Sequence, residues 1–405
     1  MQVKYLNIFK FNFLQVVVLS TPLLIINVKH ATELVILFLT IFGVYFSIRE
    51  RKLPFFHDQL KIYSYLVLAF FFSIVMSVIL SNNPIQGIDR IGSNIHFLVA
   101  PFVAYGIYKS NINLKHMLMV IKISVIIGSV YVIYGVFYLG VGPAQGGADA
   151  TTIFGFIMAF FGFTAINDIW TQSNKEKLFS IFIFFLAMYS VVLSGARIAF
   201  VICVVLSCSV MFIWSIRGYL TKKRLLLILI ALALVTAFSM NNSLFKYKIK
   251  NAITEIQLSS MDKDSSGSVG LRLLMWSGGF EAFKRQPITG YGYQNTGLEA
   301  SRHISGSYAK PFIKGQKMLH NDYINSLVGF GILGLLALLA LLFFPLIIFF
   351  RRLKAEKECA RSAIGVLFII ALLVFANTDS IYSHSVMRSF FIFFLGVLLP
   401  VARKE

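Results

Sequence analysis

The stretch Leu319-His320-Asn321-Asp322-Tyr323 closes the one long polar segment of a chain that is otherwise almost continuously apolar. This polar segment covers about residues 241–325, and a long hydrophobic run follows it directly. Two further motifs lie inside it: Gly270-Leu-Arg272-Leu-Leu-Met-Trp276 and Pro287-Ile-Thr-Gly290-Tyr-Gly292-Tyr. We therefore interpret the apolar remainder as a scaffold that holds this segment at one face of a membrane.

The composition excludes an ordinary soluble domain. Hydrophobic residues make up 58% of the 405 residues, charged residues 13%, and the mean hydropathy is +0.78. Charged residues alone reach about a quarter of a typical soluble domain. The net charge of +20 does not indicate a nucleic-acid partner, because Lys and Arg gather in short clusters between apolar stretches, as orientation signals do. The sequence predicts an all-α polytopic integral membrane protein.

About twelve stretches approach the roughly 20 apolar residues that cross a bilayer. They lie near residues 8–28, 31–48, 62–80, 93–108, 117–140, 151–169, 178–194, 198–216, 225–240, 322–350, 363–376 and 386–402. Every second connection is basic, as at Arg49, Arg51 and Lys52. The positive-inside rule places these connections and both termini in the cytoplasm.

We divide the chain into residues 1–240 with transmembrane helices 1 to 9, a long outer loop at 241–319, and residues 320–405 with helices 10 to 12. The loop is expected to be partly helical, with a helix over 270–285 that ends at Pro287. It carries eleven Lys and Arg against five Asp and Glu. An anionic ligand outside the membrane explains this excess, and a basic face beside anionic lipid headgroups is the alternative.

Two arginines are candidates for binding a phosphate. Arg197 opens the eighth span after Ser194-Gly-Ala, at membrane depth or just above, where an ionisable side chain is costly unless paired. Arg272 opens the helix of the outer loop, where its guanidinium and free backbone N–H groups are able to meet a phosphate together. Snorkelling to headgroups is the structural alternative for Arg197, and a plain surface arginine is the alternative for Arg272.

His320 is the candidate general base. It stands where the loop enters the tenth span, and an ordinary histidine pKa of about 6.5 suits proton abstraction from a hydroxyl. A purely structural histidine is the alternative.

Five further residues are candidate supporting groups. Asp379 and Arg388 flank the last outer turn, where an ion pair that closes the bundle is the favoured interpretation. Arg90 is a weaker phosphate-contact candidate on an earlier outer loop, and Arg302 and His303 add positive charge without a specific spacing.

We expect no metal and no cofactor. Asp262-Lys-Asp264 resembles the acidic pair that holds a divalent ion in soluble glycosyltransferases, but the surrounding Ser and Gly residues favour a solvated turn. Cys203, Cys208 and Cys359 show neither metal-ligand spacing nor a disulfide pattern.

The ordered motifs resemble a known family. Ser-Gly-Ala-Arg197, then Gly-Leu-Arg272-Leu-Leu-Met-Trp276 with Pro287, and Leu-His320-Asn-Asp-Tyr before a glycine-rich span are similar to the O-antigen ligase (WaaL) and Wzy polymerase superfamily. The Asp379 to Arg388-Ser pattern is similar to the ligase side of it. The family's usual arginine-then-leucine spacing is not kept, because Trp276 is the fourth residue after Arg272.

The resemblance implies a GT-C-like glycosyltransferase of the bacterial inner membrane, with its active site facing the periplasm. The donor would be a glycan on undecaprenyl pyrophosphate and the acceptor a sugar hydroxyl of lipid A-core. His320 matches the family's general base, whereas Arg197 and Arg272 match the arginines that hold the donor pyrophosphate. The transfer would invert the anomeric carbon without a metal.

Three other functions remain open. A polymerase of the same superfamily uses a second lipid-linked glycan as acceptor, and a third member type glycosylates protein but usually carries an extra soluble domain. A lipid-linked glycan transporter is less favoured, because the charged candidates gather at one outer face rather than at the midplane.

Overall fold

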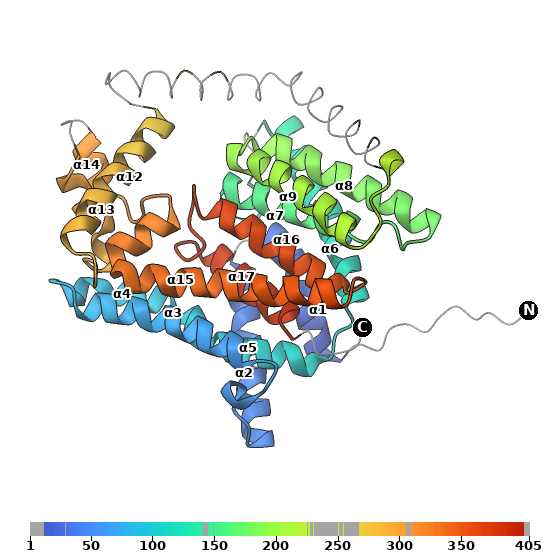
Figure 1. Ribbon diagram of the computed structural model, residues 1–405, viewed down its shortest axis with the longest axis horizontal. Coiled ribbons are helices and arrows are strands. Elements are labelled where there is room, and N and C mark those ends of the chain that lie inside the picture. The colour runs from blue at the N-terminus through green and yellow to red at the C-terminus, as the bar shows by residue number, and fades with distance from the viewer. Residues whose placement is uncertain are drawn as a thin grey trace, which may run out of the picture.

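The structure is a computed structural model, which describes residues 12–28, 30–140, 145–148, 150–224, 226, 230, 250, 254, 267–304 and 309–400. Within these ranges all regular structure is helical, and no strand occurs (Figure 1). The first group of helices is α1 Phe13–Asn27, α2 Ala31–Glu50, α3 Lys61–Ile79, α4 Pro84–Ser93, α5 Ile95–Ser110, α6 Leu114–Phe137, α7 Thr151–Ile166, α8 Asn174–Ser194 and α9 Arg197–Ile216.

The second group follows the undescribed part of the loop. It consists of α12 Ser268–Arg285, α13 Thr296–Arg302, α14 Ala309–Lys314, α15 Asp322–Ala355, α16 Ala360–Phe375 and α17 Ser385–Leu398. Two short 3₁₀ segments, η1 Pro54–Phe56 and η2 Tyr293–Asn295, complete the described elements.

Seven described helical stretches are long and apolar enough to cross a membrane: α2, α3, α4 with α5, α6, α8, α9 and α15. Four shorter apolar helices, α1, α7, α16 and α17, accompany them. This arrangement confirms the predicted polytopic all-α architecture. The predicted span at 225–240 lies almost wholly outside the described residues, as do both termini and most of residues 241–266.

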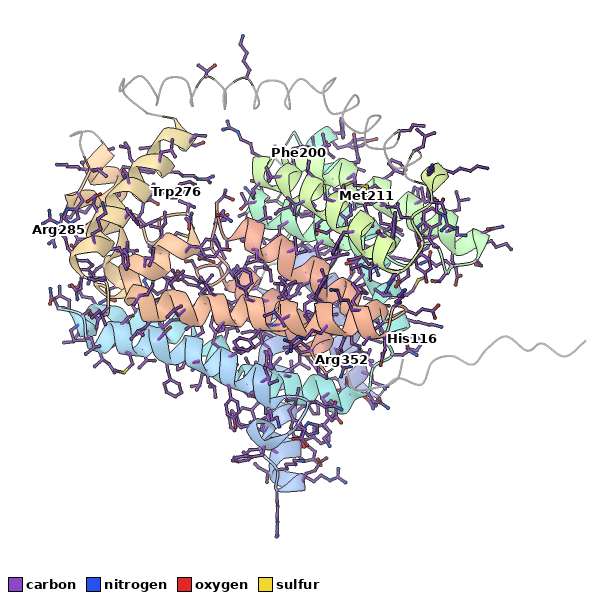
Figure 2. The ribbon with its side chains drawn as sticks, viewed as in Figure 1. His116, Phe200, Met211, Trp276, Arg285 and Arg352 are labelled. Atoms are coloured by element: carbon purple, nitrogen blue, oxygen red, sulfur yellow. The ribbon has the colours of Figure 1, made fainter. Side chains whose placement is uncertain are left out.

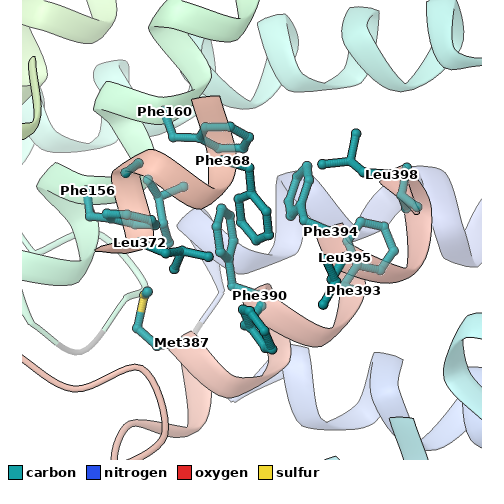
Figure 3. Close-up of a cluster of buried hydrophobic side chains, with 14 of the residues drawn as sticks. Phe156, Phe160, Phe368, Leu372, Met387, Phe390, Phe393, Phe394, Leu395 and Leu398 are labelled. Carbon is teal, nitrogen blue, oxygen red and sulfur yellow. The ribbon is translucent and has the colours of Figure 1, made fainter. Parts of the chain in front are cut away.

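The core of the bundle is dominated by phenylalanine (Figure 3). Phe390 of α17 lies at its centre and is fully buried. Its ring centroid lies 4.6 Å from that of Phe394, 5.7 Å from Phe368 of α16 and 5.9 Å from Phe160 of α7. Because lipid offers apolar contacts as good as those of a side chain, tight ring packing rather than removal from water holds these three helices together.

Helices α12 to α14 form a separate small cluster at one end of the bundle (Figure 1). Its buried residues are Met275, Ala282, Ala300, Ile304, Ala309, Ile313, Leu319 and Val328. The last two belong to the turn before α15 and to α15 itself. The loop helices therefore pack directly on the segment that carries His320.

Helix α15 is broken at Gly331, which has φ 68° and ψ −164°. The Pro287–Gly292 segment takes over the hydrogen bonds that the break releases: Tyr291 N–H donates to Val328 O at 2.8 Å, and Ile332 N–H donates to Pro287 O at 2.8 Å. A Cβ on Gly331 would lie 2.1 Å from Ile288 O, so the position requires glycine. The predicted span at 322–350 is confirmed as an apolar helical stretch, and the break at Gly331 inside it was not predicted.

The same contact explains the predicted tight turn at Gly290-Tyr-Gly292. Both glycines have positive φ, and a Cβ on Gly290 would lie 2.6 Å from the backbone of Gly331. The backbone that this turn approaches closely is that of α15. Residues 332–355 keep about 36 Å of helix at 1.5 Å per residue, which is enough to cross a bilayer core.

Candidate functional site

Asp379 lies at the centre of a buried polar cluster between α16 and α17. Its Oδ2 accepts a hydrogen bond from the Thr152 hydroxyl at 2.7 Å, and its Oδ1 accepts one from the Ser380 amide at 2.9 Å. Two imidazoles face Oδ1: His384 Nε2 at 3.0 Å and His320 Nδ1 at 3.8 Å. The cluster therefore joins the start of α7, the turn formed by residues 377–384 and the turn before α15.

The surroundings of Asp379 keep it ionised. Burial alone would raise the pKa of this carboxyl. His320, His384 and the Thr152 hydroxyl lower the pKa by more than burial raises it, so it lies well below its ordinary value. An ionised carboxylate attracts and orients a neighbouring imidazole, and it stabilises the imidazolium that forms when the imidazole takes a proton.

The turn that carries His320 is fixed on both sides. The Leu319 amide donates to the Asn325 side chain at 2.7 Å, and the Trp276 indole donates to the Leu319 carbonyl at 3.0 Å. His320 itself has φ 50°, a left-handed conformation that is uncommon without glycine and persists where the surroundings enforce it. Asn321 then caps α15 with its side-chain oxygen. The backbone therefore determines the direction of the imidazole.

His320 has a buried Nδ1 that faces Asp379 across 3.8 Å and a ring that is partly accessible. The side chain is 27% exposed. The carboxylate favours the tautomer with its proton on Nδ1, which leaves Nε2 as a proton acceptor. This is the arrangement that a general base for a hydroxyl requires.

Asp322 anchors the 377–384 turn to α15 and is fully buried. Its carboxylate accepts hydrogen bonds from the Ser380 hydroxyl and, at 2.7 Å, from the Ile381 amide. The Tyr382 hydroxyl donates to the Asp322 carbonyl at 3.3 Å. Asp322 therefore keeps Asp379 opposite the turn that carries His320.

Sequence reasoning did not single out Asp322, Thr152 or His384. Asp322 follows His320 by two residues, and His384 follows Asp379 by five. Ionisable residues this close to predicted site residues, in otherwise apolar surroundings, could have indicated that Asp322 and His384 belong to the site. Thr152 had no such signal, because its role depends on α7 packing beside the last two helices.

Arg272 lies on the face of α12 that is turned toward the His320 turn. It stands one helical turn before Trp276, and residues four apart share a helix face. The Trp276 indole reaches the carbonyl of Leu319, which precedes His320. Figure 2 shows Trp276 on the side of α12 toward the bundle and Arg285 at the outer margin.

Arg197 begins α9 beside the start of α7. Gly195 before it has φ 58°, and a Cβ on Gly155 of α7 would lie 2.9 Å from the Ser194 hydroxyl. Gly155 is only three residues from Thr152, which contacts Asp379. The start of α9 therefore lies about one helical turn from the Asp379 cluster.

Arg90 approaches the same turn from α4. Its guanidinium carbon lies 5.2 Å from the centroid of the Tyr293 ring, and the Tyr293 hydroxyl is 2.6 Å from the Ser383 hydroxyl. Burial raises the pKa of Tyr293 to about 12, so the phenol keeps its proton. A cation over an aromatic face is an attractive contact that leaves the guanidinium hydrogen-bond donors available.

Asp379 and Arg388 do not form the expected ion pair. Arg388 donates from Nη1 to the Tyr382 carbonyl at 2.8 Å, whereas the partners of Asp379 are Thr152, Ser380 and the histidines. The prediction was wrong because it rested on local spacing, and residues distant in sequence supply the nearer partners of Asp379.

Arg302 and His303 lie on and just after α13, away from these contacts. Arg302 forms an ion pair with Glu299 at 2.7 Å, and its side chain is 59% exposed. No contact joins either residue to the Asp379 cluster within the described ranges. Arg302 is thus largely neutralised by a local partner.

The described part of the chain contains no evident metal site. No group of three or more His, Cys, Asp or Glu there is gathered so as to hold a metal ion. Asp262 and Asp264 lie outside the described residues. Metal independence therefore stays a prediction.

Comparison with known proteins points to a family over part of the chain. The family model described as O-antigen ligase matches residues 182–339, which include Arg197, Arg272 and His320. This match supports membership of the O-antigen ligase and Wzy polymerase superfamily. Members of this superfamily are glycosyltransferase-like enzymes that act on lipid-linked glycans, so the match supports an O-antigen ligase- or polymerase-type function for this multi-pass membrane protein.

A relative of similar length is found in Haemophilus influenzae. The chain is 26% identical over 356 residues to an uncharacterised protein of Haemophilus influenzae strain Rd, covering 84% of this chain and 86% of that protein. The likeness to this relative thus extends beyond the segment that the family model matches.

Proposed function

We propose that this superfamily member is an O-antigen ligase of the bacterial inner membrane. It transfers a polysaccharide from undecaprenyl pyrophosphate to a sugar hydroxyl of lipid A-core on the periplasmic face. The observation that carries the proposal is the His320 imidazole at the junction of the outer loop and α15, with its Nδ1 3.8 Å from the carboxylate of buried Asp379.

The reaction needs one base and one stabilised leaving group. The acceptor oxygen attacks the anomeric carbon of the donor glycan, and its proton passes to Nε2 of His320. The bond between the anomeric carbon and the pyrophosphate oxygen breaks, and undecaprenyl pyrophosphate leaves with the electron pair. Attack opposite the leaving group inverts the anomeric carbon.

Arg197 and Arg272 stabilise the charge that develops on the pyrophosphate. Arg197 is the first residue of α9, where backbone N–H groups and the helix dipole also favour an anion, whereas Arg272 is the fifth residue of α12 and contributes through its guanidinium alone. A pyrophosphate is already a good leaving group, so cationic stabilisation replaces covalent catalysis. A contact made mainly in the transition state is worth about 10²–10³ in rate.

Deletion of the gene distinguishes a ligase from a polymerase. Loss of all polymer from lipid A-core, with polymer still accumulating on the lipid carrier, is the result expected for a ligase. A single repeat unit that remains attached to core would instead identify the Wzy-type polymerase. Unchanged lipopolysaccharide would reject both functions.

A purified-enzyme assay tests the assigned residues. With lipid-linked polymer as donor and lipid A-core as acceptor, His320→Ala is expected to lower the transfer rate by about 10²–10⁴ and Arg272→Ala by about 10²–10³. Arg285→Gln, at the exposed margin of α12, is the matched control and should retain the rate. Activity that is lost with EDTA and restored by a divalent ion would contradict the metal-free mechanism.

A further inference from the structure

Arg388 is a buried cation with little compensation. The residue is 5% exposed, and its Nη1 donates to the Tyr382 carbonyl at 2.8 Å. Its Nε is buried and has no hydrogen-bond partner among the described residues. Leaving a charged donor unsatisfied in a buried position is costly, so a fold retains it where something else gains from the charge.

Among the described residues, no carboxylate forms an ion pair with Arg388. Within the described ranges, neither Arg388 nor Arg90 has an acidic side chain within ion-pair distance. Glu33 is an acid whose charge acts on Arg388, but Glu33 is exposed to solvent. An exposed charge is screened and compensates a buried one weakly.

A second guanidinium is directed to the same place. Arg90 covers the Tyr293 ring, and the Tyr293 hydroxyl meets Ser383, which adjoins the Tyr382 carbonyl that Arg388 contacts. The charge of Arg90 acts on Arg388, and that of Arg388 acts on His96 of α5. Like charges gathered in a partly dehydrated site repel one another unless an anion lies between them.

We propose that Arg90 and Arg388 form a second oxyanion-binding site, for a phosphate or pyrophosphate group, distinct from the pair Arg197 and Arg272. The site lies on the side of the 377–384 turn toward α4 and η2. It rests on the proposed function only in that the substrates of a lipid-linked glycan transferase carry such groups. Guanidinium groups match phosphate oxygens bidentately, whereas a carboxylate offers less charge.

Two substrates are able to supply this group. One is the donor, through its pyrophosphate, and the other is a phosphorylated acceptor. Both present phosphate oxygens to Arg90 and Arg388, so a binding measurement tests whether the site exists. A kinetic measurement then identifies the substrate that occupies it.

The binding test uses inorganic pyrophosphate and the full-length protein in detergent. Thermal unfolding is followed against pyrophosphate concentration for the wild type, Arg90→Gln, Arg388→Met, Arg272→Gln and the control Arg285→Gln. Arg90→Gln and Arg388→Met are each expected to weaken pyrophosphate binding at one site by about tenfold or more, as loss of a charge-assisted hydrogen bond predicts. Binding that remains should disappear when Arg272→Gln is added.

Arg388→Met also has a characteristic effect on the ligand-free protein. Because an apolar side chain of similar length removes an uncompensated buried charge, the melting temperature without pyrophosphate should be equal to or above that of the wild type. A lower melting temperature together with unchanged pyrophosphate affinity would overturn the proposal. If Arg388→Met does not fold, Arg90→Gln decides, and unchanged affinity in that variant overturns the proposal equally.

Kinetics identify the source of the phosphate. A tenfold rise in the KM for the lipid-linked donor in Arg90→Gln assigns the site to the donor. A rise in the acceptor KM that vanishes with dephosphorylated lipid A-core assigns it to the acceptor. Two unchanged KM values would overturn the site, whereas lost pyrophosphate binding in a protein without transferase activity would overturn the proposed function and leave the site standing.

Discussion

Helices α7, α16 and α17 meet in two regions of opposite chemistry. Along their length, Phe160, Phe368 and Phe390 pack ring against ring, with centroids 5.3 Å apart for the first pair and 5.7 Å apart for the last two (Figure 3). At one end, Thr152 and His384 instead bind the carboxylate of Asp379. The aromatic region is suited to fix the helices, and the polar region to hold charge.

The difference shows how stability and chemistry are separated in this protein. The ring cluster contains no polar side-chain atom that needs a hydrogen bond. A substitution there therefore lowers stability only through lost packing. In the polar region, hydrogen bonds from Thr152 and His384 position the carboxylate of Asp379, and this carboxylate faces His320. Substitutions in the two regions should therefore have separable consequences.

Asp379→Asn should have the largest effect on the reaction. The amide is nearly isosteric but uncharged, so it no longer stabilises an imidazolium at His320 or fixes its tautomer. We expect the transfer rate per folded molecule to fall by about 10²–10⁴. Initial rates of polymer transfer, measured beside the melting temperature, test this. A rate within about threefold of the wild type would remove Asp379 from the mechanism.

Phe390→Ala should have the opposite pattern. It leaves a cavity between α7, α16 and α17, and the expected loss is about 3–5 kcal/mol in the free energy of unfolding, by analogy with buried aromatic truncations. The transfer rate per folded molecule should stay near the wild-type value. Phe390→Leu, which keeps much of the volume, serves as the milder control. A rate loss like that of Asp379→Asn with unchanged stability would erase the contrast between the two regions.

His384→Gln sharpens the comparison inside the polar region. His384 lies 3.0 Å from Asp379 Oδ1 and positions this carboxylate. Glutamine preserves a hydrogen-bond donor but has no ionisable ring, so we expect about a tenfold lower rate and an altered pH profile. A wild-type rate and pH profile would show that His384 only fills space.

Low pH should have the smallest effect. Because the pKa of Asp379 is lowered on folding, its ionised form stabilises the protein above the ordinary carboxyl pKa of about 4. That contribution is lost as the pH falls through the lower folded-state value. The melting temperature of the wild type should therefore approach that of Asp379→Asn only below about pH 4. Convergence near neutral pH would contradict an ionised Asp379.

Hydropathy predicted the spans well, because a long apolar segment in a membrane satisfies its backbone hydrogen bonds by forming a helix. The break at Gly331 escaped prediction for the same reason: the surrounding run is uniformly apolar, and the break depends on residues 287–292 arriving from earlier in the chain. The helix over 270–285 was predicted within two residues of α12, because Pro287 marks its end.

The candidate site was only partly predictable. Arg197, Arg272 and His320 stood out because each occupies a membrane boundary or a helix start. The contact of His320 with Asp379 spans 59 residues and depends on how α15 docks against the 377–384 turn. Local spacing suggested Arg388 as the partner of Asp379, and only the tertiary arrangement reveals that the imidazoles lie nearer.

The measurement that tests the central claim most directly is a double-mutant cycle between Asp379→Asn and His320→Ala, with transfer to lipid A-core as the readout. If Asp379 acts by holding His320 as the base, the double variant should be no slower than His320→Ala alone. Two losses that multiply fully would contradict this account, because Asp379 would then act on the reaction independently of His320.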